Sequence, residues 1–198
     1  NYSIAGASVV TVNITPRPLT ATYSGGTRVY DGSTTAPVSA SSADLIAGDT
    51  LGFNLQAGFT GAGAKNVGSD KPISITSASL TGADAANYSL VNATGSATGS
   101  ITPRTLNALY SGGTRVYDGS VAAPVTASLQ GLVDGDAVNA SALAVFTGAG
   151  AKNVGTGKAV SVSGITLGGS DAGNYVLAAD SASTTASVTP RPLRIDGL

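Results

Sequence analysis

Apolar and polar residues alternate along several short stretches of the chain, which is the pattern of half-buried β-strands. Leu51, Phe53 and Leu55 share one face of residues 50–57, and Ile73 and Ile75 share one face of residues 72–76. Runs rich in β-branched residues and bounded by turn residues predict further strands. These runs are residues 7–14, 20–23, 27–30, 37–40, 87–91 and 97–102. No stretch has the pattern of a long helix.

The same pattern occurs twice. The stretch Tyr-Ser-Gly-Gly-Thr-Arg-Val-Tyr-Asp-Gly-Ser fills residues 23–33 and returns, letter for letter, at 110–120, an offset of 87 residues. Ile-Thr-Pro-Arg at 14–17 returns at 101–104, and Val-Thr-Pro-Arg follows at 188–191. A repeat of this length can fold as a small domain. We therefore expect two repeats, 14–100 and 101–187, with the end of a preceding repeat at 1–13 and the start of a following one at 188–198.

Each repeat contains roughly seven or eight predicted strands, with turn signals about every 8–12 residues, which favours a sandwich or a small barrel. We expect an all-β fold: two small immunoglobulin-like β-sandwiches in an end-to-end array. The alternative is a small mixed β fold with one short helix near Leu45. Proline in each Thr-Pro-Arg joint fixes the backbone, so the joints should be short and stiff.

Composition narrows the classes of function. Charged residues make up 11% of the chain, hydrophobic residues 42%, and the net charge is −1. Without a basic patch, binding to nucleic acid is not expected. The chain has no histidine and no cysteine, so the usual general bases and thiol nucleophiles are absent and we expect no enzyme activity. Without a run of about 18 apolar residues, we expect no membrane insertion.

The repeated Tyr-Asp-Gly stretch is the first candidate site. It contains Tyr30, Asp31 and Gly32, and in the second repeat Tyr117, Asp118 and Gly119. Asp-Gly favours a tight hairpin turn because both residues tolerate a positive φ. We predict a hairpin in which the aspartate accepts hydrogen bonds from nearby backbone amides, the glycine is left-handed and the tyrosine packs beside the turn. A contact site for a ligand is the alternative.

The sparse charged residues supply two further candidates. We expect Lys65, and Lys152 in the second repeat, to pair with one of the repeated aspartates and to fix the glycine-rich loop at 61–68, although a solvated lysine is an equally good interpretation. Asp134 and Asp136 are weak candidates for a calcium site, because hard cations prefer carboxylate oxygens. No other cofactor is expected.

The Tyr-Asp-Gly stretches, the Ile-Thr-Pro-Arg joints and the Gly-x-Asp-Ala-x-Asn-Tyr stretches together resemble the YDG repeat of large bacterial surface proteins, including filamentous-haemagglutinin-like adhesins. The resemblance covers both repeats and the flanking pieces. It implies a stalk in a secreted or surface-anchored adhesin, which holds a ligand-binding tip away from the cell or builds biofilm contacts. It carries over no catalytic residues.

The first hypothesis is therefore a structural stalk of an exported protein, whose main partners are the neighbouring repeats of the same chain. The absence of cysteine agrees with an extracellular, secreted or cell-surface location. One alternative is a binding module that recognises a glycan or a protein, such as a host or cell-surface ligand, through exposed tyrosine and aspartate side chains. Another is self-association in biofilm through contacts between repeats or through edge strands.

Overall fold

The computed structural model of the protein describes residue 6 and residues 11–194. In that part of the chain the regular secondary structure is almost entirely β-strand, with no α-helix and two short 3-10 helices, η1 (Ala85–Asn87) and η2 (Ala172–Asn174). The chain is thus all-β, with two tandem, small, sandwich-like repeats, as the alternating pattern predicts. No helix in the described residues is long and apolar enough to cross a membrane.

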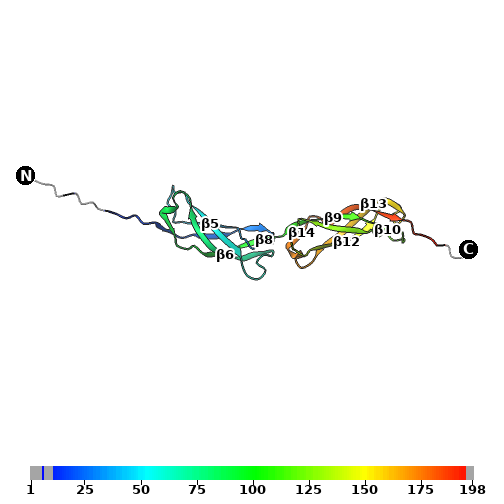
Figure 1. Ribbon diagram of the computed structural model, residues 1–198, viewed down its shortest axis with the longest axis horizontal. Helices are drawn as coiled ribbons and strands as arrows, with labels where there is room; N and C mark the ends of the chain where they lie inside the picture. Colours follow the sequence, from blue (N-terminus) through cyan, green and yellow to red (C-terminus); the bar gives the residue numbers. More distant parts are fainter. Residues whose placement is uncertain (1–5, 7–10, 195–198) are drawn as a thin grey trace, which may run out of the picture. The chain divides into compact units, whose positions relative to one another are not determined.

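The second repeat shows the plan most completely (Figure 1). Its strands are β9 (Arg104–Gly112), β10 (Thr114–Val116), β11 (Val125–Gln130), β12 (Asn139–Phe146), β13 (Gly155–Gly168), β14 (Tyr175–Leu177) and β15 (Ser181–Thr189). One sheet has the order β10-β15-β13-β12 and the other β11-β9-β14. Most pairs are antiparallel, but β10 pairs with β15 and β14 pairs with β9 in parallel. The sandwich therefore has one parallel pairing in each sheet.

The first repeat follows this plan with one interruption. Its strands are β1 (Arg17–Leu19), β2 (Thr22–Gly25), β3 (Thr27–Val29), β4 (Val38–Ser41), β5 (Gly52–Phe59), β6 (Gly68–Thr81), β7 (Tyr88–Leu90) and β8 (Gly95–Thr102). Strands β3-β8-β6-β5 form one sheet, while β1-β7 and β2-β4 form two small ones. The counterpart of β9 is thus divided into β1 and β2.

Side-chain hydrogen bonds explain this division. The Asn92 side chain accepts from the Ala21 amide and donates to the Ala21 carbonyl, both at 2.8 Å, and Asp44 accepts from the Thr20 amide at 2.9 Å. These bonds satisfy backbone groups that a neighbouring strand would otherwise pair. The second repeat has Ala179 and Gly131 at the two positions, so its strand stays continuous.

The core of each repeat lies between its sheets and is built from alternate strand residues. In β13, for example, Val160 and Val162 are buried while their neighbour Ser161 is exposed. The buried cluster of the second repeat consists of Ala144, Phe146, Val160, Val162, Ile165, Ala186 and Val188. Leu19, Ile73 and Ile75 are fully buried in the first repeat. Removing these apolar side chains from water is the main stabilising contribution expected for such a domain.

Contacts divide the chain into two compact units whose limits differ from those of the repeats. The first unit contains residues 34–64, 70–100 and the chain up to Thr27. The second unit contains the chain from Ile101 onward together with residues 28–33 and 65–69. Two short segments of the first repeat therefore belong, by their contacts, to the second unit.

Three local predictions need correction. The segment around Leu45 forms turns rather than a short helix. Asp31-Gly32 does not close a hairpin, because β3 lies beside β8 while β4 lies beside β2, so the turn connects strands of different sheets. The strand predicted at 7–14 falls partly outside the described residues, since 7–10 are not described, and residues 11–14 are not in a strand.

Candidate functional site: a tyrosine–aspartate cluster

Two tyrosine hydroxyls meet on one carboxylate within the second unit. The Tyr30 hydroxyl donates to Oδ2 of Asp136 at 2.8 Å, and the Tyr175 hydroxyl donates to the same oxygen at 2.6 Å. The two rings pack edge to face, with centroids 5.4 Å apart and an interplanar angle of 76°. This is a favourable geometry for aromatic pairs. Tyr30 is fully buried, with 0% of its surface exposed.

Local backbone bonds hold each member of the cluster. Tyr30 follows β3, and its amide donates to the Thr102 carbonyl at 2.9 Å. Asp136 closes a turn in which its amide donates to the Val133 carbonyl at 3.2 Å. Tyr175 begins β14, and its hydroxyl accepts from the Val133 amide at 3.0 Å. The carboxylate and the Tyr175 phenol are thus placed by one turn and one strand.

The electrostatics of the cluster favour neutral phenols. Burial, followed by the hydrogen bond to Asp136, raises the pKa of Tyr30 well above that of a free tyrosine. Burial and the same carboxylate raise the pKa of Tyr175. A hydrogen bond from a neutral donor to a charged acceptor is stronger than one between neutral groups. The arrangement is that of a structural clamp, in which proton transfer from either phenol is disfavoured.

A second contact lies beside the cluster and also involves a segment of the first repeat. The Val67 amide donates to Oδ1 of Asn174 at 3.0 Å, and Asn174 is only 5% exposed. Gly32 approaches Val133 so closely that a Cβ at Gly32 would lie 2.9 Å from Val133 Cγ1. Gly32 also has a φ of +78°, so both the space and the backbone at this position favour glycine.

The Tyr-Asp-Gly turns have the predicted local chemistry. Oδ1 of Asp31 accepts from the Ser33 amide at 2.8 Å, and Oδ1 of Asp118 accepts from the Ser120 amide at 2.9 Å. Each aspartate also forms an ion pair with an arginine three residues earlier, Arg28 or Arg115. Hydrogen bonds from Arg115 and Ser120 lower the pKa of Asp118 to about 2. Gly119 is left-handed, with a φ of +82°.

The predicted pairing of Lys65 and Lys152 with aspartates is not among the ion pairs of the described residues, although the charge of Lys65 is one of the smaller causes that lower the pKa of Asp171. Both lysines are exposed, and the ion pairs found within the described residues join arginine to aspartate. A different lysine fixes each glycine-rich loop: Nζ of Lys71 donates to the Gly63 carbonyl, and Nζ of Lys158 donates to the Gly150 carbonyl, each at 2.9 Å. A carbonyl oxygen can accept two hydrogen bonds, and the Gly150 carbonyl also accepts from the Asn153 amide at 2.8 Å.

Asp134 and Asp136, the weak calcium candidates, lie in a depression of about 330 Å³ that Asp31 and Lys65 also line. Asp136 already accepts hydrogen bonds from two tyrosines. Within the part of the chain that the structure describes, no group of three or more acidic, histidine or cysteine side chains converges on a point that could hold a metal ion. The lysine beside the acids further disfavours a cation here.

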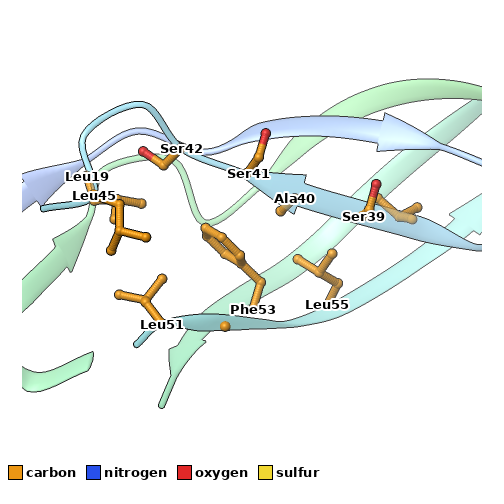
Figure 2. A pocket seen from close by; sticks show the side chains of 11 residues that line it. Leu19, Ser39, Ala40, Ser41, Ser42, Leu45, Leu51, Phe53 and Leu55 are labelled. Carbon is orange, nitrogen blue, oxygen red and sulfur yellow. The ribbon is translucent and has the colours of Figure 1, made fainter. Parts of the chain in front are cut away.

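A second concave region lies in the first unit, between β4 and the beginning of β5. It has a volume of about 340 Å³. Figure 2 shows Phe53 and Leu55 of β5, with Leu51 just before the strand, directed toward β4 and Leu45. In the second repeat Ala140 stands in the place of Phe53, so the apolar lining differs between the repeats.

The sequence predicts Tyr30 as part of the Tyr-Asp-Gly turn and Asp136 as a weak calcium candidate, whereas Tyr175 lies in an Asn-Tyr motif to which it assigns no site role. The spacing of 87 residues linked Asp49 with Asp136 and Tyr88 with Tyr175. This shared offset is the sequence signal that each aspartate is associated with the tyrosine of its own repeat. It could not show that Tyr30 joins them, because the partner lies in the other repeat of the sequence.

The comparison with protein families finds the same domain twice in the chain. A model of the YDG domain matches residues 15–97 and again residues 102–186, which together make up most of the chain. No curated protein matches the chain.

Proposed function

We propose that this chain, which belongs to the YDG domain family, is a non-catalytic stalk or spacer segment of an exported bacterial adhesin of the filamentous-haemagglutinin-like kind. Its role would be to extend a ligand-binding region from the cell surface. The tandem arrangement supports this proposal, because a length that grows with copy number is a useful property of a repeated domain.

The observation that carries the proposal is the burial of Tyr30 in the second unit, where Asp136 and Tyr175 hold it. A further support is the connection between β8 and β9. Strand β8 ends at Thr102, β9 begins at Arg104, and the single residue between them is Pro103. A proline joint of this length, reinforced by a buried tyrosine, would restrict bending.

Small-angle X-ray scattering of the dilute chain tests the proposal. At about 3.3 Å per residue, the 14 residues of β13 span about 45 Å, so a stiff pair of domains should give a rod of roughly twice one domain length. Tyr30→Ala should convert the profile to that of a flexible dumbbell, whereas Tyr117→Ala should leave it unchanged. A wild-type chain that already scatters as a flexible dumbbell would refute the stalk. Repeating the measurement with calcium tests whether a metal stiffens the joint.

A second candidate is a binding module for a glycan or a protein, and the apolar groove beside Phe53 favours it (Figure 2). The groove is open and its lining mixes leucine, phenylalanine and serine. Screening the wild-type chain and Phe53→Ala against glycans and extended peptides would test this. Binding that Phe53→Ala removes supports the module, and absence of binding in the wild type argues against it.

A further inference from the structure

Among the residues that the structure describes, the first repeat contains the receiving half of the tyrosine–aspartate cluster without an incoming tyrosine. The Tyr88 hydroxyl donates to Oδ2 of Asp49 at 2.6 Å and accepts from the Ile46 amide at 3.0 Å. The Asp49 amide donates to the Ile46 carbonyl at 3.1 Å. These bonds reproduce those of Tyr175, Asp136 and Val133. We call the group formed by Ile46, Asp49, Asn87 and Tyr88 the Asp49 socket.

The Asp49 socket is open. It borders a cavity of about 310 Å³, which Asp49, Tyr88 and Ile46 line together with residues 14–17. Asn87 is exposed, whereas its counterpart Asn174 is 5% exposed and accepts from the Val67 amide. Ile46 is 50% exposed. In the described residues, Oδ2 of Asp49 accepts one phenol, whereas Oδ2 of Asp136 accepts two.

Within the described ranges, the chain also contains the inserting half without a socket around it. Tyr117 is only half-buried, whereas Tyr30 is fully buried. Gly119 has open space around it, whereas Gly32 touches Val133. Val154, the counterpart of Val67, is 48% exposed. We call the group formed by residues 117–120 and Val154 the Tyr117 turn.

The amino-acid sequence of the inserting half is the same in both repeats. Residues 23–33 are identical to 110–120, and residues 59–68 are identical to 146–155. These two stretches contain residues 28–33 and nearly all of 65–69, the segments that belong to the second unit. The Tyr117 turn therefore presents the same side chains as the segments that already occupy a socket within this chain.

We propose that the Asp49 socket binds the Tyr117 turn of a second copy of this chain. In this head-to-tail contact, the incoming Tyr117 hydroxyl donates to Asp49 and its ring packs on Tyr88. The Val154 amide donates to Asn87. This inference rests on the proposed function, because it takes the tyrosine–aspartate cluster to be the contact that connects neighbouring repeats. It deepens that function by adding that the same contact joins separate copies of the chain.

The incoming copy brings one further backbone group to the socket. The Tyr117 amide donates to the Thr189 carbonyl at 2.9 Å, as the Tyr30 amide does to Thr102. Thr15 is the sequence counterpart of Thr102, so it occupies the place that Thr189 needs. Residues 11–16 have no regular secondary structure and Ile14 is 98% exposed, so little packing opposes their displacement.

The contact is heterologous, because the socket and the turn are different surfaces. Each copy retains a free turn at one end and a free socket at the other, so association is open-ended and should produce chains rather than closed dimers. Within one polypeptide, a short connection supplies an effective concentration of about 1 mM. Separate copies must therefore be studied up to about that concentration.

Sedimentation equilibrium with complementary variants tests the proposal. Tyr117→Phe removes the donor and keeps the socket, whereas Asp49→Asn weakens the socket and keeps the donor. Loss of a hydrogen bond to a charged group should weaken self-association of each variant about ten- to a hundredfold. An equimolar mixture should recover the wild-type affinity but stop at a one-to-one complex.

Two matched controls separate this contact from nonspecific association. Tyr110→Phe and Asp180→Asn repeat the two chemical changes outside the socket and the turn, and both should associate as the wild type does. A wild type that stays monomeric up to about 1 mM would overturn the proposal, as would association that neither variant weakens. A stiff rod in dilute scattering together with a monomer in sedimentation would retain the stalk and reject the docking.

Discussion

The Tyr30 hydroxyl and the Asp136 carboxylate are joined by a 2.8 Å hydrogen bond, although 106 residues separate them in the sequence. The other phenol on that carboxylate, Tyr175, is 39 residues away, and the same separation joins Tyr88 to Asp49. The local pair is thus a property of each repeat. Tyr30 supplies the hydrogen bond between residues that are far apart in the sequence. A substitution at Tyr30 therefore removes that bond and leaves the pair formed by Tyr175 and Asp136.

Tyr30→Phe should reduce the free energy of unfolding by about 1–3 kcal/mol, because it removes a buried donor from a partly buried carboxylate and keeps the ring. Tyr117→Phe is the matched control, since the Tyr117 hydroxyl makes no hydrogen bond within the described residues and its loss should change stability by less than about 0.5 kcal/mol. Urea denaturation of dilute protein measures both. Equal effects of the two substitutions would show that the Asp136 bond adds nothing.

The pH dependence of the second Tyr-Asp-Gly turn follows from Asp118. Its hydrogen bonds to Arg115 and Ser120 lower its pKa to about 2 in the folded protein. A carboxyl whose pKa is lower in the folded state stabilises the fold above its unfolded pKa, near 4, and loses that contribution as the pH falls toward 2. The turn should therefore weaken between about pH 4 and pH 2.

Nuclear magnetic resonance of the Asp118 carboxyl carbon checks this directly, with an expected midpoint near 2. Arg115→Gln removes the charged donor and should move the midpoint upward, toward the value for a free aspartate. Asp180, an exposed aspartate of the same repeat, serves as the internal reference. A midpoint for Asp118 that Arg115→Gln does not change would mean that the arginine does not stabilise the carboxylate.

Much of the fold could be predicted from short-range patterns. The alternation of Leu51, Phe53 and Leu55 located β5, and Ile73 with Ile75 located part of β6, because burial of one sheet face requires a period of two residues. Positive φ at Gly32 and Gly119 followed from the turn chemistry of Asp-Gly.

The pairing of strands and the composition of the cluster could not be predicted in this way. Nothing in residues 27–40 indicates that β3 lies beside β8 rather than beside β4, since that choice depends on packing between distant segments. Lys65 and Lys71 both recur in the second repeat, so the sequence alone does not distinguish which lysine contacts the glycine-rich loop. Only the fold places Lys71 on the Gly63 carbonyl.

The lysine that fixes the glycine-rich loop can be tested within one repeat. Lys158→Met should destabilise the loop by about 0.5–1 kcal/mol, because the bond from its Nζ to the Gly150 carbonyl is exposed to water. Lys152→Met makes the same substitution at a lysine within the loop itself and should leave the loop unchanged. Amide hydrogen exchange across residues 148–155 measures the opening of the loop. Faster exchange in Lys152→Met but not in Lys158→Met would contradict this assignment.

The Gly-Gly pair of the repeated stretch allows two strands to approach closely. A Cβ on Gly112, the last residue of β9, would lie 2.0 Å from the Thr185 carbonyl oxygen in β15, and a Cβ on Gly25 would lie 2.2 Å from the Thr98 carbonyl oxygen. Backbone atoms on opposed strands cannot yield as a flexible side chain can. The glycine at this position is therefore required by packing between elements, in addition to any role in the turn.

Gly112→Ala should accordingly lower the free energy of unfolding by about 3 kcal/mol, the upper part of the range for inserting a methyl group into a packed interior. Gly173→Ala is the control, because a Cβ there would meet no atom within 4 Å and the backbone has no positive φ at that residue. Thermal denaturation followed by circular dichroism compares the two. If Gly112→Ala unfolded with the same midpoint as Gly173→Ala, the close approach of β9 and β15 would have no energetic consequence.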